Sequence, residues 1–269
     1  MVEHMDPLKI RQVAIVAKPE VSEGYLQRLV AVLQKRGVEI TEVRPDHEPD
    51  GTTDPDLVFV LGGDGTMLRA TRMFPGQVLL GVNLGKVGFM SGMLPDEIET
   101  GLDKVFGGGL EVQEYRMLEV RILGEEPRLA ANDAVLIKKR PHQLISVDVE
   151  VSGEELATLR CDGFVAATPL GSTAYALSAG GPIVAGDVDC YVLVPIAPHA
   201  LVSRPLVLGE NQVAKLELVD REALVTLDGE EPREIPAGGR MEIKLSSESV
   251  KIGRTEDWSW WRAVRRTFL

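Results

Sequence analysis

The chain has 269 residues, of which 44% are hydrophobic and 26% charged, and its formal net charge at pH 7 is −12. This length suffices for a large core and predicts one or two domains. The acidic balance argues against nucleic acid or a membrane surface as a partner, although local donors still allow phosphates to bind. No apolar run reaches the roughly 18 residues that a membrane-spanning helix needs.

The two cysteines, Cys161 and Cys190, lie outside any CxxC pair. We therefore expect neither a zinc site nor a disulfide framework, and no metal site built from protein side chains. Reduced thiols favour a cytoplasmic location. The first residues, MVEHMDPLK, lack the hydrophobic segment of a secretory signal, and Met5 stays open as an alternative start.

Strand and helix signals alternate over the first 110 residues or so. Short apolar runs predict strands at 13–17, 38–43, 56–61 and 78–82. Apolar stripes predict helices between them: one capped by Ser22 and ended by Gly37, one over 66–74, and one capped by Asp96. This alternation is typical of an α/β domain with a mostly parallel sheet that is covered on both faces.

The pattern changes after three glycines at 107–109. Apolar residues then alternate with polar ones, as in half-exposed antiparallel strands. We expect an α/β domain at 1–112, a β-rich domain at 113–249, and a tail at 250–269 that packs back on the first domain. A short helix on a membrane surface is the alternative for the tryptophan- and arginine-rich tail.

The stretch LVFVLGGDGTMLRA, residues 57–70, joins a predicted strand to a predicted helix through Gly-Gly-Asp-Gly-Thr. It is not a P-loop, and the nearest candidate, GVNLGKV at 81–87, has the wrong glycine spacing and no final hydroxyl. It also lacks the third glycine of the dinucleotide fingerprint GxGxxG. Two interpretations of this turn remain: a phosphate site of another kind, or an ordinary Asp-Gly turn without a function.

Gly63 and Gly65 permit positive φ angles and bring backbone N–H groups close to an anion, and the helix start adds its positive dipole end. Asp64 would repel a phosphate that it touched directly. A carboxylate here suits either a Mg²⁺ ligand or a base that faces an attacking hydroxyl, and both are roles in phosphoryl transfer.

The GGDGT turn occurs in diacylglycerol-type lipid kinases, 6-phosphofructokinases and NAD kinases. Further along, DGFVAATPLGSTAYALSAGGPIV at 162–184 resembles the signature of NAD kinases. LGKVGF at 84–89, the pair Asn132–Asp133 and PIAPHALVSRPLVL at 195–208 follow in that family's order and spacing. The resemblance extends over residues 10–265 or so.

The resemblance implies transfer of a phosphoryl group from ATP or polyphosphate to the 2′-hydroxyl of the adenosine ribose of NAD, which gives NADP. It implies that Asp64 is the general base and that Mg²⁺ or another divalent cation is required. Gly63 and Gly65 would cradle phosphates. Arg69 is a candidate phosphate ligand or a solvated helix charge, and Lys86 is a weaker candidate.

The remaining site residues follow from the other motifs. Asn132 and Asp133 would hold a ribose diol or a carboxamide, although the pattern puts them within a strand, and a bulge or turn is the alternative. Asp162 would accept a hydrogen bond from ribose or nicotinamide, with Arg160 beside it as a ligand or as its ion-pair partner. An adenine pocket is expected from the following segment: Thr173, Ala174, Tyr175, Ala176, Leu177 and Ser178.

Two positions depart from the family pattern. Glu230 stands where relatives carry glutamine after Asp-Gly, and Gln143 stands where they often carry histidine or arginine. The family forms homodimers and homotetramers with sites built across subunits, so Asp162 and residues 173–178 can serve a neighbouring subunit. The alternative functions are a diacylglycerol-type lipid kinase and a non-catalytic NADP-binding regulatory protein.

Overall fold

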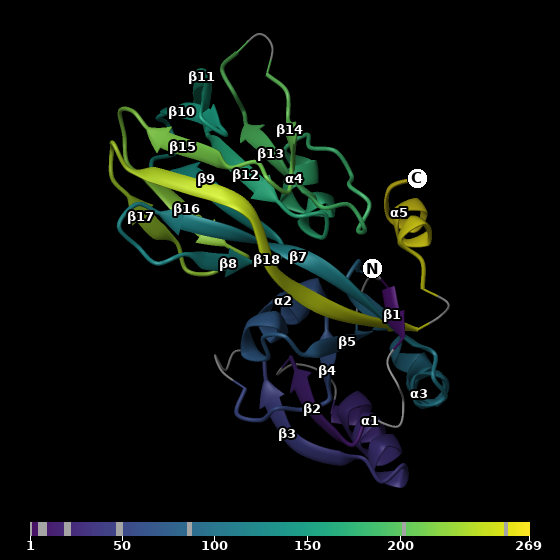
Figure 1. The fold of residues 1–269 in the computed structure, drawn as a ribbon. Helices are drawn as coiled ribbons and strands as arrows, with labels where there is room; N and C mark the ends of the chain where they lie inside the picture. The colour runs from purple at the N-terminus through teal and green to yellow at the C-terminus, as the bar shows by residue number, and fades with distance from the viewer. Residues whose placement is uncertain are drawn as a thin grey trace. The chain divides into compact units, whose positions relative to one another are not determined.

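The computed structural model describes residues 2–4, 10–18, 23–46, 51–84, 88–200, 203–255 and 258–269. The expected helix cap Ser22 and the candidate ligand Lys86 lie outside these residues. The chain divides into two compact units, one formed by Met1–Glu114 with Val250–Leu269 and the other by Tyr115–Ser249. Figure 1 shows both units along one chain.

The first unit is built on a parallel sheet. Its strands, in the spatial order β3-β2-β4-β5 followed by the end of β18, are β3 (Glu39–Pro45), β2 (Gln12–Ala17), β4 (Leu57–Gly62), β5 (Val78–Asn83) and β18 (Arg240–Thr255). The short β6 (Ser91–Met93) also pairs with β5, and β1 (Val2–His4) pairs antiparallel with β7. β4 is buried at every position, as expected for a parallel strand covered on both faces.

Helices cover both faces of this sheet. Phe59 of β4 packs in one core with residues of α1 (Glu23–Lys35) and α3 (Ile98–Phe106). The opposite face meets α2 (Asp64–Met73), since a Cβ at Gly81 would lie 2.9 Å from the sulfur of Met67. The expectation that Asp96 caps α3 is wrong. A 3-10 turn, Pro95–Glu97, precedes the helix, and the Glu97 carboxylate accepts the Leu94 N–H instead.

The second unit contains two antiparallel sheets. The first sheet consists of β11 (Glu154–Cys161), β10 (Ile145–Val151), β15 (Ala214–Leu218), the start of β18, β7 (Leu110–Ile122) and β8 (Arg128–Ala130). The second runs in the order β14 (Leu206–Gly209), β13 (Cys190–Ile196), β12 (Gly163–Ala167), β9 (Asp133–Lys138), β16 (Ala223–Leu227) and β17 (Arg233–Ile235).

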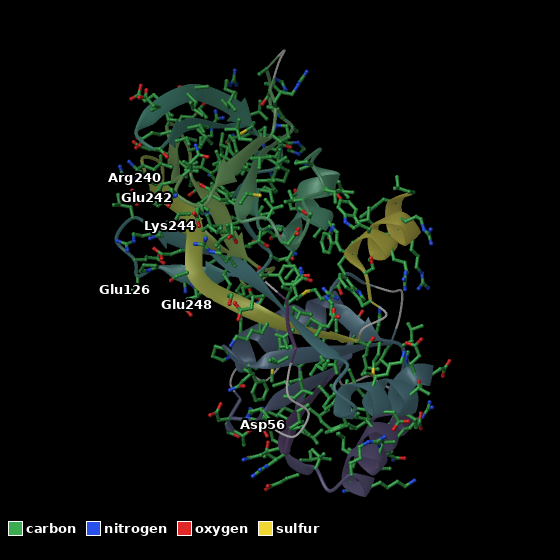
Figure 2. The ribbon with its side chains drawn as sticks, turned by 45° about the vertical axis from the view of Figure 1, so that its right-hand side comes forward. Asp56, Glu126, Arg240, Glu242, Lys244 and Glu248 are labelled. Atoms are coloured by element: carbon green, nitrogen blue, oxygen red, sulfur yellow. The ribbon has the colours of Figure 1, made fainter. Side chains whose placement is uncertain are left out.

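The inner faces of the two sheets share one hydrophobic core, to which both contribute alternate residues. In β18, for example, Met241 and Ile243 are buried, whereas Arg240, Glu242 and Lys244 are not, and Figure 2 labels these three along the strand. The outer face of the second sheet carries a smaller cluster that includes Ala176 of α4 (Tyr175–Ser178).

The predicted fold class is confirmed: an α/β part with a mostly parallel sheet is combined with a β-rich part. No helix among the described residues is long and apolar enough to cross a membrane. The last helix, α5 (Trp260–Phe268), belongs to the first unit and buries Trp260, Ala263 and Val264.

Candidate active site

The Gly-Gly-Asp-Gly-Thr turn lies at the carboxyl end of β4. Gly62 ends the strand, Gly63 caps α2, and Asp64 is the first helical residue, so the helix begins two residues before the predicted start. Gly63 and Gly65 are exposed, and neither uses a positive φ angle. Gly62 is needed for close packing, since a Cβ there would lie 2.3 Å from the Thr66 hydroxyl. The glycines thus leave the helix start open to solvent.

Asp64 is held by a second segment of the chain. The N–H groups of Phe89 and Met90 donate to its two carboxylate oxygens, at 3.0 Å to Oδ2 and 3.2 Å to Oδ1. A carboxylate has about four acceptor positions, so capacity remains for a substrate hydroxyl. A Cβ at Gly88 would lie 2.1 Å from Asp64 Oδ1, so only glycine lets this segment come so close.

Arg69 does not extend freely from α2. Its Nη2 and Nε contact Oδ2 of Asp46, at 2.5 Å and 3.2 Å, and Asp46 also accepts the hydroxyl of Thr66. Asp46 is 5% exposed and needs a cation beside it. The guanidinium thus ties the middle of α2 to the residue that follows β3, and the role of Arg69 as a phosphate ligand stays a prediction.

Asn132 and Asp133 lie at the break between β8 and β9, so the expectation of a mid-strand position is wrong and the turn alternative is correct. The cause is Asp228. Its carboxylate accepts the N–H groups of Ala131, Asn132 and Asp133 at 2.7 to 3.0 Å, which pulls this stretch out of a straight strand. Asp228 itself has a left-handed φ of 50°.

The Asp133 carboxyl is buried, with 8% of the residue exposed. Burial and the negative charge of Asp228 together raise its pKa to about 7, against the lowering effect of the Asn132 amide. A carboxyl with this pKa donates a hydrogen bond when protonated and accepts one when ionised. Asp133 therefore suits a ligand group of either polarity near neutral pH.

The raised pKa of Asp133 predicts a pH-dependent stability. The stability that the protonated Asp133 carboxyl contributes is fully present below about pH 4 and is lost as the pH rises through about 7. The reason is that the unfolded chain releases this proton at a lower pH than the folded protein does. As the pH rises from 5 to 8, the free energy of unfolding of the wild type should fall by about 2–3 kcal/mol relative to that of Asp133→Asn, which has no carboxyl at this position. Urea unfolding of both proteins across this range checks this. The exposed Asp187→Asn is the matched control, and equal pH profiles for all three proteins would refute the assignment.

The adenine-pocket segment follows a tightly packed turn. Thr168 donates its hydroxyl to the Ala131 carbonyl at 2.7 Å, and a Cβ at Gly171 would lie 2.1 Å from the Asn132 carbonyl oxygen. The turn that precedes the segment thus packs directly against Ala131 and Asn132. Of the segment's residues, Ala176 is buried, Thr173 and Leu177 are partly buried, and three are exposed: Ala174, Tyr175 and Ser178.

Asp162 and Arg160 lie elsewhere in the second unit. In the β9–β12 pairing, Asp133 faces Ala167 while Ile137 faces Gly163. Asp162, which directly precedes β12, therefore lies at the opposite end of this strand pair from Asp133, about 17 Å along the sheet. The Asp162 carboxylate accepts a hydrogen bond from the ammonium group of Lys138 at 2.5 Å. The suggested Arg160–Asp162 ion pair is not formed. The Arg160 side chain is exposed, and its carbonyl accepts the His199 N–H.

Several residues of these sites were missed by sequence reasoning. Asp228 carried a signal, since Asp followed by Gly is typical of a left-handed turn residue. Gly88 and Phe89 lie in LGKVGF at 84–89, which the resemblance marked without giving either residue a role. Lys138 carried no signal, because its partner Asp162 comes from another part of the chain. Glu230, whose added charge raised doubt, forms an ion pair with Arg128 and so does not bring an unbalanced charge to this turn.

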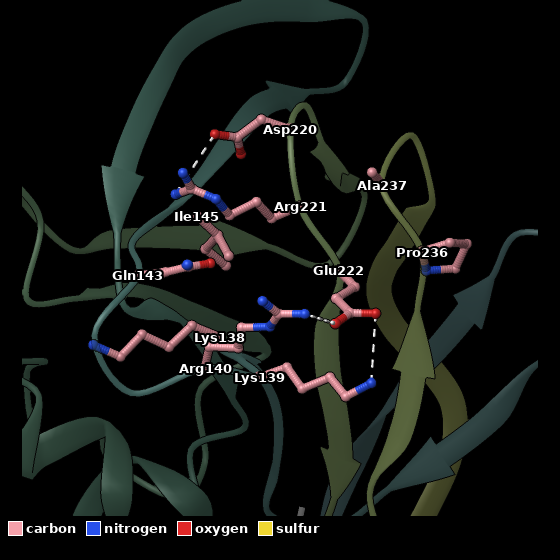
Figure 3. A pocket seen from close by; sticks show the side chains of 10 residues that line it. All are labelled: Lys138, Lys139, Arg140, Gln143, Ile145, Asp220, Arg221, Glu222, Pro236 and Ala237. Atoms are coloured by element: carbon pink, nitrogen blue, oxygen red, sulfur yellow. Dashed lines mark ion pairs between the residues drawn. The ribbon is translucent and has the colours of Figure 1, made fainter.

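A separate pocket of about 410 Å³ contains Gln143 and lies near Lys138 (Figure 3). Its cations are already paired. Lys139 contacts Glu222 at 3.4 Å, and Arg140 contacts the same carboxylate at 3.9 Å. These ion pairs leave the pocket without a clear anion-binding centre, and we do not assign it to the active site.

An exposed, glycine-rich helix start at the carboxyl end of a parallel sheet is typical of enzymes that bind the phosphate groups of a nucleotide. Residues 5–110 match the ATP-NAD kinase N-terminal domain, and residues 131–255 match the ATP-NAD kinase C-terminal domain. The chain belongs to the NAD kinase family, which confirms the resemblance, and it is an enzyme that phosphorylates NAD.

Relatives and solved structures agree with this family. The NAD kinase of Methanothermobacter thermautotrophicus is 35% identical over 83% of this chain and 84% of its own length, and that of Leifsonia xyli is 36% identical over 88% and 79%. An Archaeoglobus fulgidus NAD kinase in complex with ATP matches with a TM-score of 0.79 and 28% identity, over 96% of this chain and 97% of its own. Yeast NADH kinase complexed with NADH shares the fold, with a TM-score of 0.84 and 23% identity, over 96% and 87%. Nothing in these comparisons favours the lipid-kinase or regulatory alternatives.

Proposed function

We propose that the enzyme moves the γ-phosphoryl group of ATP to the 2′-hydroxyl of the adenosine ribose of NAD, with Asp64 as the general base. The ribose 2′-oxygen forms a bond to the γ-phosphorus, the bond from this phosphorus to the bridging oxygen breaks, and ADP leaves. The hydroxyl proton passes to Asp64. The supporting observation is that two backbone N–H groups orient this carboxylate and leave part of its acceptor capacity open.

Gly63, Gly65 and the first turn of α2 would receive phosphates, because backbone N–H groups at an exposed helix start attract anions. Arg69 keeps a supporting role in our proposal, since its pair with Asp46 anchors this helix. Residues 1–112 thus serve as the nucleotide-binding domain, and the tail at 250–269 belongs with it.

The β-rich domain, residues 113–249, would bind NAD. Asn132 and Asp133 offer an amide and a buried carboxyl to ribose or carboxamide groups. The adjoining segment 173–178 offers hydroxyls, one aromatic ring and small side chains for adenine. Asp162 lies at the far end of the β9–β12 pair from Asp133, and Arg160 lies in β11 just before it, which fits a contact to a nucleotide in a neighbouring subunit of a homodimer or homotetramer.

The direct test is to incubate the pure protein with NAD, ATP and Mg²⁺ and to measure NADP formation. NADP should form with ATP, and parallel reactions with polyphosphate as donor and NADH as acceptor define the substrate range. Labelled phosphate that reaches diacylglycerol but not NAD would contradict the proposal, as would NADP binding without turnover with any donor.

Activity should require a divalent cation. The described residues contain no group of three or more His, Cys, Asp or Glu side chains that could hold a metal ion. This fits Mg²⁺, which commonly takes most of its ligands from nucleotide phosphates and water and supplies charge neutralisation of the transferred phosphoryl group. Excess EDTA should reduce NADP formation to background, and added Mg²⁺ or Mn²⁺ should restore it. Undiminished turnover in EDTA would contradict this requirement.

A cytoplasmic location is also part of our proposal. Cys161 and Cys190 are both free and buried, which is compatible with a reducing compartment.

A further inference from the structure

The aromatic ring of Phe89 is enclosed by the last helix of the chain. It packs against Trp260 with ring centroids 5.1 Å apart and an interplanar angle of 58°, and it stacks on Phe268 at 5.6 Å and 17°. Phe89 and Trp260 are 6% and 7% exposed. Two of the three aromatic rings of α5 thus contact one residue, and that residue directly follows the closely packed Gly88.

The backbone of Phe89 is held at both of its polar groups. Its carbonyl oxygen accepts a hydrogen bond from Nη2 of Arg254 at 2.7 Å, and its N–H group donates a hydrogen bond to the Asp64 carboxylate. Arg254 is 2% exposed, and its guanidinium carbon lies 3.3 Å from the centre of the Trp258 ring, a close cation–π contact. The ring of Phe89 is therefore fixed by Trp260 and Phe268, and its carbonyl group by Arg254.

These contacts reach the carboxylate in one further step. Asp64 stands at the exposed start of α2, where its χ1 and χ2 angles alone would permit several rotamers. The Phe89 and Met90 N–H groups select one of them by engaging both carboxylate oxygens. The Phe89 ring and N–H group are attached to the same Cα, so packing that fixes the ring also restricts the backbone that carries this donor to Asp64.

We propose that α5 is a positioning element for catalysis, in which Trp260 and Phe268 act through Phe89 to orient the Asp64 carboxylate toward the acceptor hydroxyl. This inference rests on the proposed role of Asp64 as general base. It assigns to the C-terminal helix a specific effect on the chemical step, separate from nucleotide binding. The effect is on kcat, since a misdirected base weakens proton transfer while the phosphate and ribose contacts remain.

Phe268→Ala is the informative variant, because Phe268 is 38% exposed and its removal should leave the fold intact. We expect kcat to fall roughly tenfold, with KM for NAD and ATP changed less than about twofold. Phe268→Tyr keeps the stacked ring and should restore most of kcat. Trp261→Ala, in the same helix at a 66% exposed position, is the matched control and should behave like the wild type.

A double-mutant cycle separates positioning from general destabilisation. In an Asp64→Asn background, Phe268→Ala should lower kcat by less than twofold, because the group on which it acts has already been removed. Thermal unfolding midpoints are measured for each variant, and Phe268→Leu, which keeps apolar volume without the ring, replaces Phe268→Ala if the alanine variant does not fold.

An unchanged or increased kcat in Phe268→Ala, or in Phe268→Leu where that variant replaces it, would overturn the inference. The inference would also be overturned if Phe268→Ala lowered kcat by the same factor in the wild-type and Asp64→Asn backgrounds. If Asp64→Asn itself retains wild-type kcat, the proposed role of Asp64 fails instead, so the two failures are distinguishable.

Discussion

An Asp64→Asn variant is expected to lose at least ~10²-fold in kcat while it still binds NAD and ATP. Asparagine keeps the size of the side chain and one acceptor oxygen for the Phe89 and Met90 N–H groups, but it cannot take the proton of the 2′-hydroxyl. The lost factor corresponds to about 2.7 kcal/mol of transition-state stabilisation. Steady-state kinetics and equilibrium titration with each nucleotide measure the two effects separately.

The matched control is Asp103→Asn in α3, which removes an exposed carboxylate of the same unit and should leave kcat unchanged. If Asp64→Asn turns over at the wild-type rate, Asp64 is not the base. If it loses nucleotide binding to the same degree as turnover, the carboxylate serves binding rather than the chemical step.

An Asp228→Ala variant should lose about 3–4 kcal/mol of unfolding free energy, because three N–H groups at the Asn132–Asp133 turn lose their common acceptor. The left-handed φ of 50° adds strain for alanine. Since the same bonds shape the proposed NAD contacts, KM for NAD should also rise. Urea unfolding and kinetics of the folded fraction measure the two effects.

Asp228→Asn is the control for this effect. It retains an acceptor oxygen and tolerates the left-handed backbone, so its loss should stay near 1 kcal/mol. Similar unfolding midpoints for the alanine variant and the wild type would show that water satisfies the three N–H groups and that Asp228 does not shape the turn.

The first four parallel strands, β2 to β5, were predictable to within one or two residues, because a strand buried on both faces reads as a short apolar run bounded by polar residues. The short β6 and the parallel end of β18 were not predicted. The start of α2 was not predicted either. Glycine and aspartate are poor helix formers, which argues against a helix at Asp64. At the first helical position, however, aspartate interacts favourably with the helix dipole, and this end effect overrides its low propensity.

The site residues were predictable by type but not by contact. Residues 128–138 read as one strand, and the break at Asn132 depends on Asp228, which lies about a hundred residues later in the chain. Arg69 reads as a helix charge until the fold brings Asp46 beside it. In both cases the partner comes from a distant part of the chain, so no local pattern reports it.

The first unit is discontinuous in the chain, and this affects its synthesis. Lys251 and Ile252 complete the sheet by pairing with Val78 and Leu79 of β5, yet a ribosome makes them some 170 residues later. Until then that stretch of β5 is an unpaired strand edge, a known starting point for aggregation. The nascent N-terminal half therefore stays vulnerable while the β-rich middle is being made, and it gains this partner only after Lys251 and Ile252 have been made.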